Sequence, residues 1–204
     1  MRRAAVAASA LAPRPGTAVE IGCEGGRWSI LLASQGWDLV CTDICPESLQ
    51  LCQRRLPQAK CILVGPTDTT FPCAPNTTSL LLCMEVDPVS SSEWFVDEAL
   101  RVLRRGGILV VTFLNKTSLR ALFHKLLRRS GGERAFYKAS YNTYRRRLLR
   151  AGFSFIDEGG CCWAPFTRDS NSSFVPLFVW LEKCLGLRYL PRLSPWVVLV
   201  AQKL

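Results

Sequence analysis

Short runs of apolar and β-branched residues recur along the chain, and each has the length of a single strand. They lie at residues 18–21, 39–42, 61–64, 80–83, 108–114, 153–156 and 196–201. Helical patterns fill the gaps at residues 28–34, 46–56 and 92–103. In these stretches apolar side chains recur every three or four positions, which is the spacing of a helix with one buried face. Strands that alternate with helices in this way predict parallel βαβ units.

The alternation therefore predicts an α/β fold, a doubly wound sheet with helices on both faces. The chain of 204 residues is long enough for one such domain and too short for two. Ligands of these sheets bind outside the carboxyl ends of the strands. A glycine-rich turn, Gly22 to Gly26, follows the first strand, and Asp43 ends the second. Both are expected at this edge, so they are the leading candidates for a ligand site.

The sequence of the turn, GCEGGR, bears on which cofactor fits. A dinucleotide loop needs G-x-G-x-x-G, but Glu24 and Arg27 stand where its second and third glycines belong. A carboxylate is unfavourable beside phosphate, because like charges about 4 Å apart repel by about 4 kcal/mol at an effective dielectric constant of 20. S-adenosylmethionine carries an ammonium and a sulfonium and no phosphate, so Glu20 and Glu24 would attract it. Asp43 lies about 20 residues beyond Gly22, as expected of an acid that binds ribose hydroxyls.

At this point residues 18–111 resemble the core of the class I S-adenosylmethionine-dependent methyltransferases, particularly the group with the quinone-biosynthesis C-methyltransferases. VEIGCEGG is similar to their first motif, LLLCMEVDPV to their fourth strand and its loop, and EALRVLRRGGILVVTFLN to the helix, glycine turn and fifth strand. The tail from Tyr144 resembles, more loosely, a sixth strand and an antiparallel seventh. The resemblance implies a Rossmann-like, mostly parallel sheet of seven strands that binds S-adenosylmethionine.

The resemblance also implies the residues around the cofactor. The amino group would lie near Glu20 in the first motif, the ribose on Asp43 and the adenine against Ile44. After the third strand, either Thr67 or Asp68 would meet the adenine amino group. The residues expected to bind the cofactor are Glu20, Gly22, Cys23, Gly26, Asp43, Ile44, Thr67, Asp68 and Cys83.

Two features depart from the family pattern. Glu24 replaces the middle glycine of the first motif, and only about 17 residues precede the first strand, where relatives carry a longer helical cap. Either departure would weaken or abolish catalysis. A catalytically inactive, cofactor-binding protein therefore remains an alternative to an enzyme.

Methyl transfer depends on alignment and exclusion of water more than on acid–base machinery. A general base is needed only if the acceptor keeps its proton until late. The candidates are Glu85, at the end of the fourth strand, and His124, the sole histidine. For Glu85 a backbone-capping role is equally plausible, and for His124 a solvated or packing role is favoured. Tyr141 and Tyr144, placed before a basic helix, are expected to be packing or lid residues.

The net charge of +10 comes from one segment, residues 116–150, with eleven Lys or Arg residues and one acid. Its first part has an apolar face, which suits an amphipathic helix at a membrane surface or over an anionic substrate. A solvated basic face, packed on the domain by its apolar side, is the alternative. Residues 161–195 hold six aromatic residues and are expected to form an apolar insertion over the cofactor edge, with ordinary core packing of an extra helix as the alternative.

These features predict a small-molecule or lipid-like acceptor, with peripheral membrane contact through residues 116–150. The runner-up is methylation of RNA or protein through the basic segment. The fourth strand lacks the (Asn/Asp/Ser)-Pro-Pro-aromatic motif used on exocyclic base amines, which disfavours nucleic acid.

Ten cysteines are present without any C-x-x-C pair, so no metal is expected, and the cysteines are interpreted as small apolar residues. This usage predicts a reducing, cytoplasmic compartment, with membrane association through the basic segment. No apolar run reaches the roughly 18 to 20 residues that span a bilayer. Residues 1–17 are expected to form a short cap over the site, with a targeting segment at residues 1–13 as the alternative.

Overall fold

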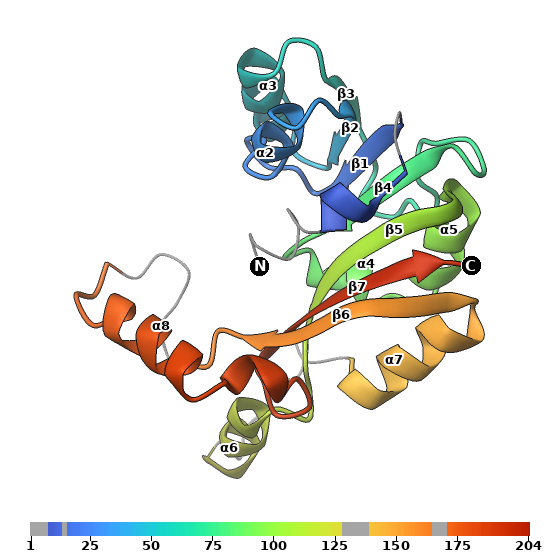
Figure 1. Cartoon of the computed structure of the whole chain (residues 1–204). Helices are drawn as coiled ribbons and strands as arrows, with labels where there is room; N and C mark the ends of the chain where they lie inside the picture. Colours follow the sequence, from blue (N-terminus) through green and yellow to red (C-terminus); the bar gives the residue numbers. More distant parts are fainter. Residues whose placement is uncertain (1–7, 14–15, 128–138, 165–170) are drawn as a thin grey trace.

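A seven-stranded sheet forms the centre of the computed structural model, which describes residues 8–13, 16–127, 139–164 and 171–204, with the backbone alone for 124–127. The strand order is β3-β2-β1-β4-β5-β7-β6 (Figure 1). The strands are β1 (Thr17–Ile21), β2 (Asp38–Asp43), β3 (Lys60–Leu63), β4 (Thr78–Cys83), β5 (Leu103–Leu114), β6 (Phe153–Cys161) and β7 (Trp196–Lys203). Strands β1 to β5 pair in parallel, and β7 runs antiparallel to both β5 and β6. The predicted doubly wound sheet with an antiparallel last strand is confirmed.

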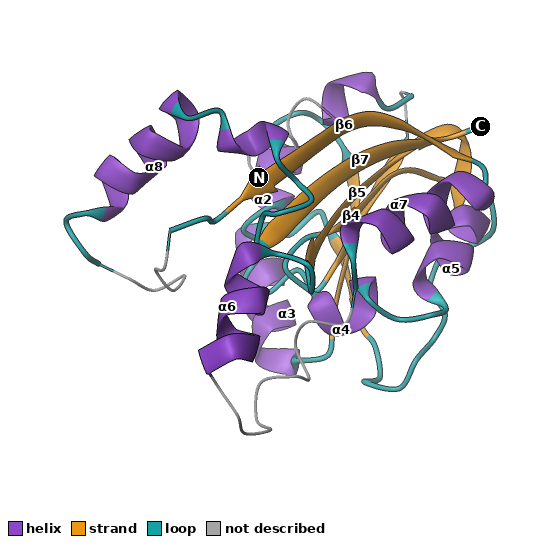
Figure 2. Cartoon of the chain, turned by 90° about the horizontal axis from the view of Figure 1, so that it is seen from below, coloured by secondary structure: helices purple, strands orange, loops and turns teal. Residues whose placement is uncertain are grey.

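Helices cover both faces of this sheet, and each face has its own apolar cluster. On one face lie the helical residues 8–11, α2 (Ser29–Ala33) and α3 (Pro46–Arg55). On the other lie α4 (Asp87–Ser90), α5 (Phe95–Val102) and α7 (Tyr141–Arg150). Figure 2 shows α5 and α7 next to each other on this second face. The central strand β4 is buried along its whole length, because helices exclude water from both of its sides.

Helix α7 begins earlier than its sequence indicated. Ser140 caps it by accepting a hydrogen bond from the Thr143 backbone N–H, so Tyr141 and Tyr144 lie inside the helix and not before it. Both tyrosines are buried, and the Tyr144 ring stacks on Phe113 at 4.4 Å between centroids. The predicted position of the tyrosines ahead of a basic helix was wrong, because Ser140 is the N-cap and Tyr141 is the first helical residue. Their burial agrees with the predicted packing role.

Two helices expose the apolar side chains that helices of this size normally bury. They are α6 (Leu119–Leu127) and α8 (Val175–Cys184), which is followed by the 3-10 turn η1 (Leu187–Tyr189). Both views show α8 standing away from the sheet (Figures 1 and 2), and none of its residues is buried. Within the described residues no helix is both long and apolar enough to cross a bilayer.

Candidate functional site

A cavity of about 680 Å³ opens at the carboxyl ends of β1 to β4. Its size lies in the range of about 300–1,000 Å³ that is typical of small-molecule sites. Four loops supply its walls, one after each strand, so residues far apart in the chain meet there. The lining residues are Ile21, Gly22, Glu24, Thr42, Asp43, Ile44, Val64, Gly65, Pro66, Thr67, Asp68, Thr70, Phe71, Met84, Glu85, Val86, Pro88, Val89 and Trp94.

Asp43 holds the first two walls together. Its Oδ2 accepts a hydrogen bond from the Glu24 backbone N–H at 2.8 Å, and its Oδ1 accepts one from the Cys45 N–H at 3.0 Å. The side chain is 9% exposed and lines the cavity. A carboxylate oxygen can accept a second hydrogen bond, so both oxygens retain capacity for ligand hydroxyls. Asp43 is thus fixed in place and still able to bind.

Glu24 takes up a backbone conformation that glycine would adopt without cost. Its φ is +48°, in the left-handed region where a side chain is strained by roughly 1–2 kcal/mol. The hydrogen bond of its N–H to Asp43 holds this conformation. That amide therefore serves an acid of the protein and is not turned toward a phosphate. The loop keeps the shape of a glycine loop without offering the phosphate cradle of one.

The charge of the cavity has one sign. Its lining includes four acidic side chains, Glu24, Asp43, Asp68 and Glu85, and no lysine, arginine or histidine among the described lining residues. Phosphate groups would be repelled in this setting, whereas a sulfonium or an ammonium would be attracted. The basic residues that give the chain its net charge of +10 lie elsewhere.

The loops after β2 and β3 bring further expected cofactor residues to the cavity. Ile44 is 60% exposed and faces the cavity from the end of β2, the position expected for contact with adenine. After β3, the loop at 65–68 is closed by Asp68, whose Oδ2 accepts a hydrogen bond from the Gly65 N–H at 2.7 Å. Thr67 and Asp68 both line the cavity, so the structure brings these two candidates together with Asp43 and Ile44.

Four of the expected cofactor residues do not line the cavity: Glu20, Cys23, Gly26 and Cys83. Glu20 is 1% exposed, and its carboxylate accepts a hydrogen bond from the Ser29 hydroxyl of α2. Burial raises its pKa to about 8. Cys83 lies in the apolar cluster with α5 and α7, and burial raises the pKa of its thiol. Of the first motif, Ile21, Gly22 and Glu24 reach the cavity.

Gly22 shows why the motif needs glycine at that point. Its φ is +67°, and a Cβ there would lie 2.5 Å from Cγ2 of Val86, in the loop after β4. The first and fourth loops therefore touch across this glycine. Because Val86 also lines the cavity, a side chain at Gly22 would displace part of the wall.

The two candidates for a general base differ in what the structure shows. Glu85 lines the cavity, with φ at +65°, and its backbone N–H donates to Thr112 Oγ1 at 2.7 Å. This geometry turns the residue out of β4 toward the site. His124 belongs to α6, and its side chain lies outside the described residues. Both catalytic roles stay predictions.

Several lining residues were not anticipated from the sequence. Phe71 and Trp94 pack edge to face, with 5.6 Å between ring centroids, and form an apolar wall with Met84 and Val89. Of these residues, only Met84 could have been predicted to line the site, because it directly follows a predicted strand. Trp94 directly precedes α5, and the short helix α4 lies between Trp94 and the end of β4 in the chain.

The expected insertion at residues 161–195 contributes nothing to the lining within its described part. Its helix α8 stands apart from the body (Figure 1). A role as a cover over the cofactor therefore stays a prediction.

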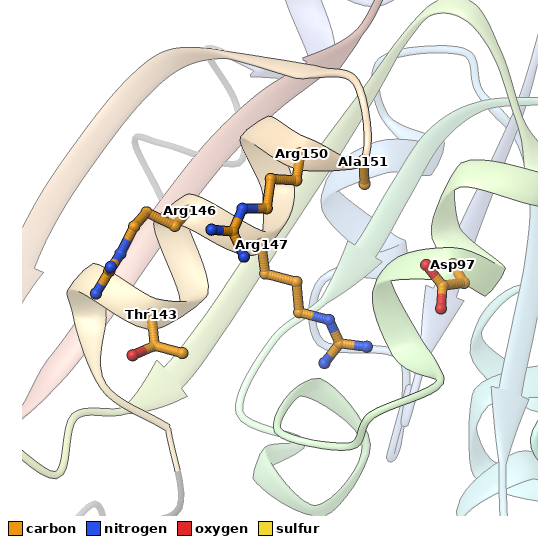
Figure 3. A pocket seen from close by; sticks show the side chains of 6 residues that line it. All are labelled: Asp97, Thr143, Arg146, Arg147, Arg150 and Ala151. Carbon is orange, nitrogen blue, oxygen red and sulfur yellow. The ribbon is translucent and has the colours of Figure 1, made fainter.

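A second hollow, with the opposite charge, lies between α5 and α7. It is lined by Asp97, Thr143, Arg146, Arg147, Arg150 and Ala151 (Figure 3). It shares no residue with the cavity. Of its arginines, Arg147 already makes a hydrogen bond within the domain, since its Nη1 donates to the Ser92 carbonyl at 3.0 Å. Similarly, Arg145 is paired with Glu158 at 3.1 Å. The basic surface of α7 is therefore partly used to attach the helix to the domain.

A family of known proteins shares the segment that forms the cavity. Residues 19–111 match the model of the methyltransferase domain. This segment of the chain is a methyltransferase domain, similar to those of the class I S-adenosylmethionine-dependent methyltransferases. The segment contains all the lining residues of the cavity, so the domain match and the acidic site coincide.

Solved structures with the same fold are distant in sequence. An S-adenosylmethionine-dependent methyltransferase from Mesorhizobium loti is 13% identical, with a TM-score of 0.64 over 97% of this chain and 96% of that one. A possible histamine N-methyltransferase from Thermotoga maritima is 17% identical, with a TM-score of 0.59 over 100% and 90%. The [4+2]-cyclase SpnF is 18% identical, with a TM-score of 0.61 over 98% and 80%. No curated protein matches the chain. At these identities the likeness shows the fold.

The cavity fits S-adenosylmethionine, the cofactor of this family. Asp43 can accept from the ribose hydroxyls, Ile44 offers an apolar surface to the adenine, and Glu24 places a carboxylate near a cationic group. When bound, the cofactor supplies an electrophilic methyl group. The acidic lining and the amide of Glu24 turned to Asp43 both exclude a phosphate-bearing cofactor from the loop.

Proposed function

We propose that this methyltransferase acts on a small-molecule or lipid-like acceptor. The observation that carries the proposal is the composition of the cavity, which joins four acids near the cofactor loop to an apolar wall. An acceptor rich in phosphate would meet no compensating positive charge among the described lining residues. An apolar acceptor would meet Phe71, Val89 and Trp94, whose burial by a ligand is favourable at about 25 cal/mol per Å².

Exposed apolar helices support a contact with lipid. On α8 the side chains of Leu177 and Trp180 are 49% and 58% exposed, and on α6 Phe123 is 61% exposed. Single exposed apolar residues are common, but three on one helix, here Leu177, Val179 and Trp180 on α8, form a larger apolar surface of the kind that binds a partner or lipid. We infer that α6 and α8 rest on a membrane surface from which the acceptor is drawn, aided by the basic charge of residues 116–150.

Glu85 is the residue we assign to the acceptor's proton. It lines the cavity beside the apolar wall formed with Val86 and Val89. An acceptor that must lose a proton during transfer would pass it to this carboxylate, and an acceptor without such a proton would need only alignment. His124 is kept as the second candidate on the sequence alone.

The first experiment offers tritiated S-adenosylmethionine to the full chain with a total lipid extract, a water-soluble metabolite extract, RNA and a protein lysate in parallel. Label that enters the lipid fraction or the metabolite fraction supports the proposal. Label in RNA or protein instead favours the alternative that relies on the basic segment. Binding of S-adenosylhomocysteine without transfer to any fraction favours the inactive protein. Glu85→Gln tests the base, and Glu93→Gln, an exposed acid outside the cavity, is its control.

The second experiment measures sedimentation with vesicles of anionic lipid and with vesicles of zwitterionic lipid. Leu177→Ser with Trp180→Ser is expected to reduce binding to anionic vesicles while leaving the fold intact, because no residue of α8 is buried. Equal binding by the parent and the double variant would refute the membrane contact and leave the cavity proposal standing.

A further inference from the structure

Three cysteine sulfurs converge on the side of the cofactor loop that faces away from the cavity. Cys41 lies on β2, Cys52 on α3 and Cys61 on β3, and their Sγ atoms all lie within 4.8 Å of one another. We call these three residues the thiol cluster. Figure 1 shows β2, β3 and α3 together at one end of the sheet.

The fold assembles this cluster from separate elements. Cys41 and Cys61 are direct partners in the parallel pairing of β2 and β3, and Cys52 belongs to the buried side of α3, which packs on those strands. A sequence search for C-x-x-C pairs finds nothing here, because each sulfur comes from a different element.

A fourth sulfur lies beside the cluster. Cys23, in the loop after β1, packs in the same buried cluster as Cys41 and Cys52, although its Sγ is not among the three that lie within 4.8 Å of one another. The Ser29 hydroxyl is also 3.2 Å from Cys41 Sγ, a contact of the kind that orients a metal ligand. Cys23 and Cys41 are fully enclosed, whereas Cys61 is half-buried on the edge strand, which provides the route for an ion.

The spacing suits a thiophilic ion. With metal–sulfur bonds of about 2.3 Å, sulfurs stand about 3.8 Å apart in a tetrahedral site and about 4.0 Å apart in a trigonal one. Separations of up to 4.8 Å therefore require shifts of less than roughly 1 Å, which rotation of cysteine side chains can supply. Thiolates select Zn²⁺ and Cu⁺ over harder cations.

We propose that the thiol cluster binds one thiophilic d¹⁰ cation, Zn²⁺ or Cu⁺, with Cys23 as the fourth ligand when the ion is zinc. Each sulfur that binds releases its thiol proton to solvent, and no electron is transferred. The expectation of a chain without metal came from sequence spacing alone. The proposal does not depend on the identity of the methyl acceptor.

A metal bound to the thiol cluster would hold the cofactor loop from the side opposite the cavity. A Cβ on Gly26 would lie 3.0 Å from Cys52 Sγ, and Arg55 of α3 donates to the Gly25 carbonyl at 2.8 Å. A metal that joins Cys23 to α3 and β3 would therefore fix the loop whose other side carries Gly22 and Glu24. Metal binding is expected to raise the unfolding temperature of the protein.

The test begins with the full-length protein, purified under reducing conditions, and elemental analysis for zinc and copper. The metal-free form is then titrated with Co²⁺, a spectroscopic substitute for Zn²⁺ that shows thiolate-to-metal absorption only when sulfur binds it, and separately with Cu⁺ against a chelator. One equivalent is expected. Cys61→Ser should weaken binding by more than the roughly 100-fold that loss of a second-shell partner costs.

Matched variants make the result specific. Cys83→Ser replaces an equally buried cysteine on the other face of the sheet, and Cys184→Ser an exposed one; both should bind like the parent. Cys61 is half-buried, so its variant should fold, as circular dichroism will verify. Cys23→Ser should weaken Co²⁺ binding and leave Cu⁺ binding unchanged.

Two results would overturn the proposal. One is a folded parent that takes up no more Co²⁺ or Cu⁺ than Cys61→Ser does. The other is a Cys41–Cys61 disulfide in the purified protein that persists under reductant and leaves no site for a metal.

Discussion

The five residues from Gly22 to Gly26 have two sides with opposite properties. Gly22 and Glu24 face an open, acidic cavity, whereas Cys23 and Gly26 face a closed cluster with Leu32, Cys41 and Cys52. Neighbouring residues of one motif thus serve a ligand on one side and packing on the other. A match to the motif therefore identifies the loop but not which of its residues touch the cofactor.

The largest expected effect is a loss of ligand affinity at the open side of the loop. Asp43→Ala removes the acceptor of two backbone hydrogen bonds and the carboxylate expected to accept from the ribose hydroxyls. Since hydrogen bonds to a charged group contribute about 1.5–3 kcal/mol each, affinity for S-adenosylhomocysteine should fall at least roughly 100-fold. The measurement is thermal unfolding with the ligand, where the parent should gain about 2.7 kcal/mol at 100 times the dissociation constant.

The control for this variant is Asp38→Asn, an exposed acid at the other end of β2, which should keep the full ligand-induced shift. A normal shift in Asp43→Ala would show that the ligand does not use this edge of the sheet.

The next effect belongs to the closed side. Burial raises the pKa of Glu20 from 4.5 to about 8, so between these pH values the folded state keeps a proton that the unfolded state has lost. The free energy of unfolding should therefore decrease as pH rises from about 5 to about 8, by an amount on the order of 3 kcal/mol. Glu20→Gln cannot ionise and should lack this decrease. Urea unfolding at several pH values compares the two proteins, and parallel curves would contradict the prediction.

A smaller loss of stability is expected at Gly22, where the glycine loop contacts the loop after β4. Gly22→Ala places a Cβ against Val86 at a φ of +67°, and the strain and contact together should cost about 1–3 kcal/mol of stability. Gly36→Ala, also at positive φ but with open space around it, isolates the backbone part. The prediction fails if the two variants lose equal stability.

The smallest effect has a favourable sign. Glu24→Gly relieves a left-handed backbone at φ +48° and should stabilise the free protein by roughly 0.5–1 kcal/mol. It also removes a carboxylate from the cavity, so the ligand-induced shift should shrink. Asn76→Gly, at φ +58° outside the cavity, should leave the ligand-induced shift unchanged; it should not gain the same stability, because asparagine tolerates this φ and the Asn76 side chain accepts a hydrogen bond from Lys203. An unchanged shift in Glu24→Gly as well would show that this charge does not assist binding.

Local pattern predicted most of the elements. The helix 46–56 was found because Pro46 opens it and Leu49 and Cys52 share its buried side. The short helix α4 was missed, because four residues are too few to show a period. Helix α8 was expected as part of an apolar insertion. Its sequence is apolar nearly all round, so no buried face could be predicted, and the structure leaves the helix unburied.

The candidate site divides in the same way. Asp43, Ile44, Thr67, Asp68 and Glu85 follow strand ends, so the rule that parallel strands present their carboxyl ends at one edge sufficed to bring them to the cavity. Glu20 did not follow, because side chains alternate along β1 and the register with β2 turns this one toward Ser29 and α2.

The sequence by itself determined the fold, the loop and the sign of the charge that the loop presents, because strand period, glycine position and acid content are local properties. Tertiary structure alone decided which side of the loop each residue faces and that three distant cysteines meet beneath it. Those outcomes depend on the register of β2 with β3 and on the side that α3 presents to them, and neither follows from the spacing of residues along the chain.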